Sequence, residues 1–339
     1  MEISELGEFG LIDRLTRDIP LNNPSTLLAA GDDAAVMDYG DKELLATTDL
    51  LLEGIHFNLK YVPLKHLGYK SAIVNFSDIY AMGGKPKQIL VSLGISNRFT
   101  VEHIDEFYSG INLACQIYGV DLVGGDTSAS MSGLVISITC LGEVEKGKSI
   151  KRSGAKPTDL ICVSGDLGAA YMGLQLLERE NSIAAESGKD FQPDFAGKEY
   201  ILERQLKPEA RKDILEALKE ADVHPTSMID VSDGLSSEIL HICKSSDVGC
   251  RIYEDKIPID FQTALMAEEF NMNLVTAAMN GGEDYELLFT VPLIEREKIE
   301  KLKGVRMIGY ITEPTLGAML VSRDGNELPI KAQGWNSLK

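Results

Sequence analysis

Short apolar runs that lead into an aspartate recur along this chain, and they constrain its fold more than any other feature. Leu44–Thr48 precedes Asp49, Val120–Val123 leads through two glycines to Asp126, and a third run delivers Asp230. Apolar runs of this length bounded by turn residues are typical of buried strands. We therefore expect these aspartates at or near strand ends, where open sheets often carry their chemistry.

Helical patterns separate these runs. Lys65–Met82 is expected to be a helix on which Ser71, Asn75 and Asp78 share one face, and Val101–Tyr118 is expected to be an amphipathic helix. The alternation of strands and helices predicts an α/β or α+β fold. The other expected elements are the helices Glu5–Arg17, Ala169–Arg179, Glu209–Ala221, 235–245 and Ile294–Lys303, the strands Gln88–Ser96, Leu134–Val144, Leu160–Ser164, Met228–Val231, Tyr285–Val291 and Val305–Tyr310, a loop over Asn181–Gly197 and a hairpin at Asp324-Gly325.

The length of 339 residues suits two domains, and 44% hydrophobic residues are enough for a substantial core. Residues 145–160 are polar and contain Pro157. We place the boundary there, which gives domains 1–148 and 149–339.

The net charge and the cysteines indicate which partners and which cellular compartment to expect. There are 52 acidic and 33 basic residues, a net charge of −19, which argues against a nucleic-acid partner. Five cysteines show no C-x-x-C spacing, which favours buried thiols in a reducing compartment. The N-terminus lacks an apolar signal core, and no apolar run approaches the ~20 residues of a membrane span. We expect a cytoplasmic protein with no membrane partner.

One motif is misleading. Gly142–Ser149 matches the P-loop pattern G-x-x-x-x-G-K-[ST] in every letter. A P-loop must open a helix, but Gly154 and Pro157 leave no room for one, and Glu143 and Glu145 would place negative charge in the phosphate cradle. We interpret the segment as a turn between domains.

The aspartates themselves point to a hard cation. They lie near the hydroxyls of Thr47, Thr48 and Ser232, and no His or Cys cluster accompanies them, which argues against zinc. Oxygen-only ligands favour Mg²⁺, which proteins usually hold together with substrate phosphates. Such an inventory can support phosphoryl transfer, whereas no Ser/His/Asp or Cys/His pairing stands out. Each segment alone is equally consistent with an ordinary turn or a solvated surface.

Seven segments together resemble the thiamine-monophosphate kinase family, in order and in spacing. They are Gly31-Asp32-Asp33-Ala34-Ala35, Thr47-Thr48-Asp49 with Glu53–Phe57, Lys70–Gly83, Val123–Thr127, Arg152–Pro157, Ile229–Gly234 and Gly281–Leu287. The wider superfamily includes aminoimidazole ribonucleotide synthetase and selenophosphate synthetase. The latter carries a reactive residue near its N-terminus, whereas the first cysteine here is Cys115.

The resemblance implies two domains, each a mostly antiparallel or mixed sheet covered by helices, as in the aminoimidazole ribonucleotide synthetase-like fold. Residues 1–148 would bind metal and ATP and form a homodimer, and residues 149–339 would complete the nucleotide and substrate site. The implied reaction is phosphorylation of thiamine monophosphate to thiamine diphosphate, the last step of its biosynthesis, by direct in-line transfer from ATP with several Mg²⁺ ions. The acceptor phosphate is largely ionised near neutral pH, since its second pKa is about 6, so no general base is expected.

The resemblance also implies the residues of the site. The implied Mg²⁺ ligands are Asp33, Thr47, Thr48, Asp49, Asp78, Asp126, Asp230 and Asp233. The implied nucleotide contacts are Tyr108, Gly125, Arg152 and Ser232, and the implied thiamine-phosphate contacts are His56, Glu283 and Trp335. Two alternatives stay open: an ATP-using superfamily member acting on another phosphorylated substrate, and a non-catalytic protein that binds divalent cations.

Overall fold

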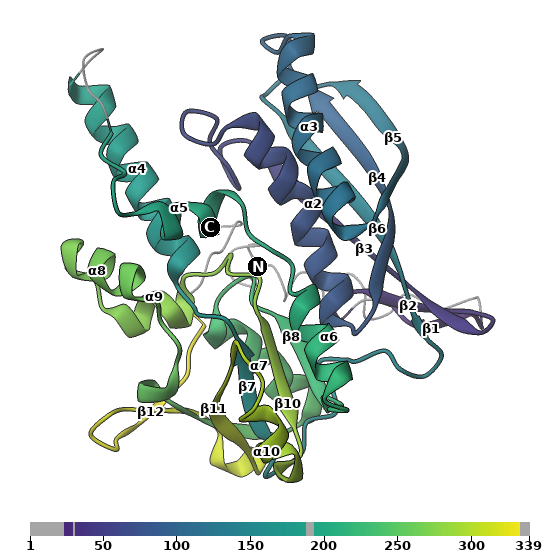
Figure 1. The fold of residues 1–339 in the computed structure, drawn as a ribbon, viewed down its shortest axis with the longest axis vertical. Coiled ribbons are helices and arrows are strands. Elements are labelled where there is room, and N and C mark those ends of the chain that lie inside the picture. The colour runs from purple at the N-terminus through teal and green to yellow at the C-terminus, as the bar shows by residue number, and fades with distance from the viewer. Residues whose placement is uncertain (1–23, 30, 188–192, 333–339) are drawn as a thin grey trace, which may run out of the picture.

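The computed structural model describes residues 24–29, 31–187 and 193–332, and these form two sheets with their covering helices (Figure 1). The expected helix Glu5–Arg17 lies outside the described residues. The strands of the first sheet are β1 (Thr26–Leu28), β2 (Ala35–Tyr39), β3 (Lys42–Leu52), β4 (Lys85–Ile95), β5 (Asp121–Ala129) and β6 (Val135–Glu145). Their order is β1-β2-β3-β6-β4-β5, and only β4 and β5 pair in parallel.

Helices α2 (Leu64–Ala81) and α3 (Val101–Tyr118) accompany this sheet, and α2 packs on β3, β4 and β6. Most of the 18 residues of α2 are buried, because the helix also contacts β8 of the second half. The two helices cross closely at a pair of glycines: a Cβ on Gly68 would lie 1.9 Å from the Phe107 carbonyl oxygen, and one on Gly110 would lie 1.9 Å from that of Lys65. The backbones therefore touch only because neither position has a side chain.

The second sheet has the order β13-β12-β9-β11-β7-β10-β8, with β12 and β9 as its parallel pair. Its strands are β7 (Leu160–Ser164), β8 (Ser227–Asp230), β9 (Gly249–Tyr253), β10 (Leu287–Val291), β11 (Val305–Thr312), β12 (Ala318–Val321) and β13 (Glu327–Pro329). The helices of this half are α4 (Ala169–Ser187), α5 (Glu199–Leu206), α6 (Lys212–Glu220), α7 (Leu235–Ser246), α8 (Phe261–Glu269), α9 (Leu274–Asn280) and α10 (Arg296–Ile299).

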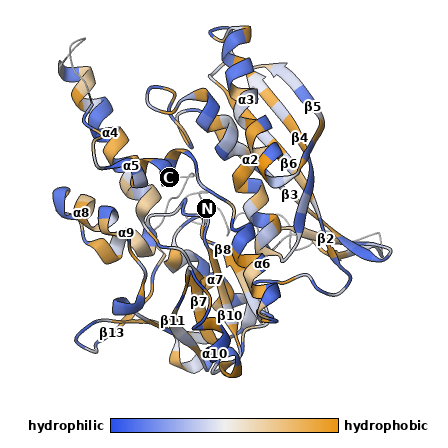
Figure 2. Ribbon diagram, viewed as in Figure 1, coloured by the Kyte–Doolittle hydropathy of each residue, from blue (hydrophilic) through white to orange (hydrophobic). Residues whose placement is uncertain are grey.

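Separate apolar clusters cover the two faces of the second sheet. Side chains of α7 and α9 pack on one face, and those of α6 and α10 pack on the other. The hydropathy colouring shows hydrophobic segments along β10, which lies between these two clusters, and along α2 and β4 in the core of the first sheet (Figure 2). Two mixed sheets covered by helices confirm the expected fold class.

Two strands are longer than the sequence predicts. β3 continues past Asp49 to Leu52, so Asp49 lies within the strand, opposite Ile138. β5 begins at Asp121 and continues to Ala129, so Asp126 also lies within a strand and not after its end. The expectation of strand-end positions for these two aspartates was wrong, because pairing with neighbouring strands continues through the polar residues.

Two helical predictions also need correction. The expected loop Asn181–Gly197 was wrong over its first part, because α4 continues to Ser187 and extends away from the body (Figure 1). A helix end that projects into solvent needs no apolar stripe, so its polar composition resembled a loop. The expected helix Ile294–Lys303 is a short 3₁₀ turn, Leu293–Glu295, followed by the single turn α10.

The described helices leave out two kinds of element. No helix begins between Ser149 and Ala169, so the P-loop look-alike lacks the helix that the motif requires, as predicted. Among the residues that the structure covers, no helix is both long enough and apolar enough to cross a membrane.

Candidate active site at the junction of the two sheets

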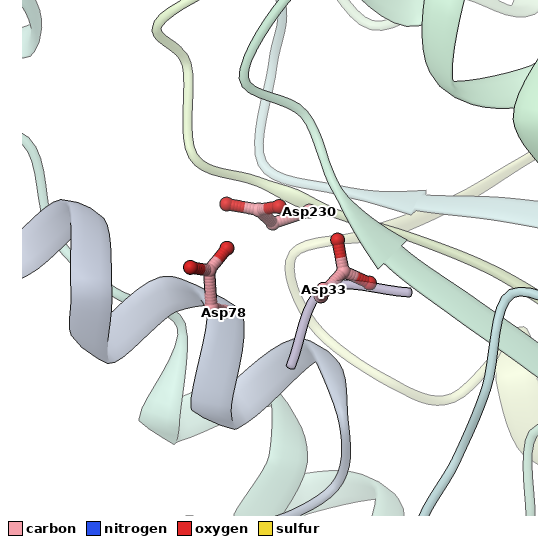
Figure 3. A group of neighbouring side chains, drawn as sticks. All are labelled: Asp33, Asp78 and Asp230. Carbon is pink, nitrogen blue, oxygen red and sulfur yellow. The ribbon is translucent and has the colours of Figure 1, made fainter. Parts of the chain in front are cut away.

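Three carboxylates from distant parts of the sequence meet between the two halves. Asp33 precedes β2, Asp78 lies near the end of α2, and Asp230 ends β8. One oxygen of each lies within 4.8 Å of the others (Figure 3). Because β8 is the edge strand of the second sheet and contacts α2, the site exists only where the two halves touch.

A neighbouring donor holds each of these carboxylates. Thr47 Oγ1 donates to Asp78 Oδ2 at 2.6 Å, Ser77 Oγ donates to Asp230 Oδ2 at 2.6 Å, and Arg152 Nη2 donates to Asp33 Oδ1 at 2.6 Å. The second oxygen of Asp33, Oδ2, is buried and has no hydrogen-bond partner among the described residues. The carboxylates are thus oriented, and at least one acceptor remains unsatisfied.

The electrostatics of the cluster are unfavourable without a cation. Burial raises the pKa of Asp230 to about 7 and that of Asp49 to about 6. Burial, and then the charges of Asp49 and Asp230, raise the pKa of Asp78 well above its usual range. Ionising all of these groups together costs free energy that a bound cation would offset. An all-oxygen donor set with an unpartnered buried oxygen fits a hard divalent cation such as Mg²⁺.

Not every expected ligand reaches this cluster. The Thr48 hydroxyl contacts Thr139 Oγ1 and the Ile138 carbonyl, both at 3.1 Å. Thr48, Thr139 and Leu90 lie opposite one another across β3, β6 and β4, on the face of the sheet away from the buried core. Asp126 is exposed on the edge strand β5. Thr48 and Asp126 therefore lie apart from the three clustered carboxylates.

The first turn of α7 adds a buried carboxylate, Glu238, that no sequence pattern singled out. Glu238 Oε1 accepts a hydrogen bond from the Asp233 amide at 3.0 Å and lies 3.5 Å from Ser232 Oγ. Burial, followed by the charge of Asp233, raises the pKa of Glu238 well above its usual range. An acidic residue in the first turn of a helix is common, so the sequence did not distinguish it. Ser77 was missed likewise, although it immediately precedes Asp78.

The residues expected at the nucleotide occupy three elements. Tyr108 is half-buried on α3 and meets Phe107 edge-on, with ring centroids 5.9 Å apart. A Cβ on Gly125 would lie 1.8 Å from the Val91 carbonyl oxygen, so close pairing of β5 with β4 explains this glycine. The Arg152 amide donates to both oxygens of Asp32, at 3.2 and 3.1 Å, and Arg152 Nε is buried without a hydrogen-bond partner among the described residues.

The residues expected at the substrate are placed as follows. The Leu52 amide donates to His56 Nδ1 at 3.0 Å and closes the turn after β3. Glu283 has a φ of +59°, and its side chain, 30% exposed, pairs with Lys70 at 2.8 Å. Trp335 lies outside the described residues.

Known proteins match this chain almost from end to end. Residues 31–144 match the family model of AIR synthase related protein, N-terminal domain. The chain is 34% identical to the thiamine-monophosphate kinase of Aquifex aeolicus (strain VF5), over 93% of this chain and 98% of that protein. It is 33% identical to the thiamine-monophosphate kinase of Bacillus subtilis (strain 168), over 98% and 100%.

Solved structures show the same similarity. AaThiL complexed with AMPPCP and TMP matches with a TM-score of 0.83 at 34% identity, over 99% of this chain and 98% of that one. The hydrogenase maturation protein HypE in complex with ATP, at 17% identity and a TM-score of 0.65, shares the fold alone. By sequence and by structure, the chain belongs to the thiamine-monophosphate kinase family.

Proposed function

We propose that this protein transfers the γ-phosphoryl group of ATP to the phosphate of thiamine monophosphate, giving thiamine diphosphate and ADP in the last step of thiamine diphosphate biosynthesis. The meeting of Asp33, Asp78 and Asp230 between the two halves carries the proposal. A site that joins two phosphate-bearing substrates needs concentrated positive charge, which clustered carboxylates supply by holding metal ions. The names of the relatives, and AMPPCP with TMP in the AaThiL structure, support the two substrates.

The carboxylates would hold several Mg²⁺ ions. We assign Asp33, Asp49, Asp78 and Asp230 as the central ligands, and Asp126 and Asp233 as further ligands once nucleotide is bound. Bound Mg²⁺ would neutralise the oxygens of the transferring phosphoryl group. Thr47 acts by holding Asp78, and Thr48, which lies on the same face of the sheet as Asp126, would be a further ligand beside it.

The proposed substrate contacts are those that the family resemblance implies. We assign the nucleotide to Tyr108, Gly125, Arg152 and Ser232, and thiamine phosphate to His56, Glu283 and Trp335. The Nε of Arg152 has no hydrogen-bond partner among the described residues, which supports its assignment, because a phosphate oxygen would satisfy that buried donor. Residues 1–148 would then carry the metal and ATP site, and residues 149–339 would complete it.

The transfer is direct and in line. An ionised oxygen of the acceptor phosphate forms a bond to the γ-phosphorus while the bond from that phosphorus to the bridging β-γ oxygen breaks. The acceptor oxygen needs no general base, because the second pKa of a phosphate monoester is about 6. With an isotopically chiral γ-phosphate, a single transfer gives inversion at phosphorus, and retention would indicate a phosphoenzyme intermediate.

The enzyme is further proposed to be a homodimer paired through the first sheet. Leu50 and Leu90 are 54% and 37% exposed on the sheet face that α2 leaves uncovered, and every residue of the edge strand β5 is exposed. Exposed apolar side chains beside an open strand edge are typical of association surfaces.

All five cysteines are free and buried, which supports the expected cytoplasmic location.

The deciding experiment measures ADP release and thiamine diphosphate formation with ATP and Mg²⁺, with and without thiamine monophosphate. The proposal expects stoichiometric ADP and thiamine diphosphate only when thiamine monophosphate is present, and no turnover by Asp49→Ala or Asp126→Ala variants that remain folded. ATP turnover independent of thiamine monophosphate would indicate another substrate. Full activity of either variant would refute the ligand assignment.

A further inference from the structure

A buried lysine from the first half of the chain holds the Glu283 carboxylate. Lys70 Nζ lies 2.8 Å from Glu283 Oε1 and donates to the Gln205 carbonyl at 3.1 Å. Gln205 Nε2 donates to Glu283 Oε2 at 2.9 Å. Each oxygen of one carboxylate is therefore held by a different helix, α2 on one side and α5 on the other.

The backbone at Glu283 is fixed as firmly as its side chain. Its φ of +59° is rarely adopted by a residue with a Cβ, and such conformations persist only where the surroundings determine them. The Glu283 amide donates to the Ser232 carbonyl at 2.6 Å, which ties it to the turn beside the clustered carboxylates. A strained residue held at both carboxylate oxygens and at its amide is typical of a site that must be preorganised.

Burial distinguishes the two partners of the ion pair. The Lys70 side chain is 8% exposed, so it is poorly placed to contact a substrate, whereas the Glu283 side chain is 30% exposed. Gln205 is also buried, and its Oε1 has no hydrogen-bond partner among the described residues. Lys70 and Gln205 can therefore act on a bound molecule only through the carboxylate that they orient.

Helix α2 connects this arrangement with the phosphoryl-transfer site. Lys70 and Asp78 are eight positions apart on one helix, a rise of about 12 Å. The helix is buried along most of its length, so its two ends keep a fixed separation. The residue that orients Glu283 and a ligand of the proposed metal site thus share one rigid support.

We propose that Lys70 and Gln205 are positioning residues that set the Glu283 carboxylate for contact with thiamine monophosphate, at the far end of the substrate from the transferring phosphate. This inference rests on the proposed function. Without Lys70 or Gln205, the Glu283 carboxylate would remain in the site but would no longer have a fixed orientation. The loss should appear in recognition of thiamine monophosphate and not in recognition of ATP.

Steady-state kinetics of Lys70→Met, Gln205→Leu and Glu283→Gln test this. Each variant should raise KM for thiamine monophosphate about 10- to 100-fold, as expected for loss of an oriented charged hydrogen bond. KM for ATP should change by less than about twofold, within the spread for sites that do not interact. Lys70→Arg, which keeps the charge, should recover part of the loss. An unchanged KM for thiamine monophosphate in folded Lys70→Met and Gln205→Leu proteins would overturn the inference.

The double variant Lys70→Met/Glu283→Gln separates positioning from a general structural role. If Lys70 acts through Glu283, the double variant should bind thiamine monophosphate as Glu283→Gln alone does, whereas additive losses would show that it acts independently. Lys207→Met is the matched control, because Lys207 pairs with Glu209 at 2.8 Å just after α5, and it should leave KM for thiamine monophosphate unchanged. A wild type without activity towards thiamine monophosphate would refute the proposed function, whereas an active wild type with an unaffected Lys70→Met refutes only this inference.

Discussion

Arg152 Nη2 donates to Asp33 Oδ1 at 2.6 Å across 119 residues of sequence. The two side chains are 15% and 1% exposed, so this is a buried ion pair. Arg152 lies on the segment that joins the two sheets, and Asp33 lies in the turn before β2. The pair therefore fixes one carboxylate of the cluster to the start of the second half of the chain.

Arg152→Ala should destabilise the metal-free protein by about 3 kcal/mol, because removing one partner of a buried pair leaves the other charge uncompensated. Added Mg²⁺ should restore more stability to this variant than to the wild type, since the cation replaces the lost positive charge beside Asp33. Urea denaturation in EDTA and in Mg²⁺ measures both effects. An equal response to Mg²⁺ in the two proteins would show that Asp33 lies outside the metal site.

Asp78→Asn should lose activity while gaining stability in the absence of metal. Burial and the charges of Asp49 and Asp230 raise the pKa of Asp78, so a neutral amide removes repulsion from the cluster. Turnover should fall by about 10³-fold, because charge stabilisation by a bound metal is worth several kcal/mol. Melting curves in EDTA, together with ADP release, test the pair of effects. Asp38→Asn is the control. It removes a carboxylate on β2 that pairs with Lys146 away from the cluster, and it should change neither the melting curve nor the turnover.

The sequence predicted elements better than it predicted their limits. The bounds of α3 and β7 were predicted as observed, because periodicity and turn residues mark them. The end of β3 was not predicted, since pairing with β6 carries the strand through Thr47-Thr48-Asp49. Because the strand continues through these residues, their side chains alternate between the two faces of the first sheet, and Thr48 lies on the face opposite to that of Asp49.

The site was only partly accessible from sequence for a similar reason. The aspartates were recognisable as a set, and the structure gathers Asp33, Asp78 and Asp230. Which donor holds which aspartate was not recognisable, because the contacts from Ser77 to Asp230 and from Arg152 to Asp33 span 153 and 119 residues. Such pairs are set by how the two halves dock, which no local pattern encodes.

Lys148→Ala should leave turnover and KM for ATP within about twofold of the wild type, as for a surface change without a partner. Lys148 is exposed, and the neighbouring Gly147 amide donates to Glu43 Oε1 at 2.9 Å, so a group that a P-loop would direct to phosphate is already bonded. Kinetics with varied ATP check this. A large rise in KM for ATP would restore the P-loop interpretation.

Leu50→Asp should convert the proposed dimer to monomers without unfolding them. Leu50 is 54% exposed on the uncovered face of the first sheet, so a charge there costs little in the monomer but is strongly unfavourable inside an apolar interface. Light scattering after size-exclusion chromatography gives the mass directly. Ile294→Asp is the matched control, because Ile294 is 87% exposed in the second half, and that variant should keep the wild-type mass. A Leu50→Asp protein of unchanged mass would remove this face from the interface.

The free energy of unfolding in EDTA should depend on pH through Asp284. Asp284 is buried, accepts a hydrogen bond from the Gly168 amide at 2.8 Å, and burial raises its pKa to about 7 despite the nearby Arg204. The folded state therefore holds a proton that the unfolded state releases, so stability falls as pH rises from about 4 to about 7, by at most about 1.4 kcal/mol per unit. Urea titrations of Asp284→Asn, which cannot ionise, should show a flatter slope than the wild type over this range. Parallel slopes would mean that Asp284 is already ionised in the folded protein, with Arg204 outweighing burial.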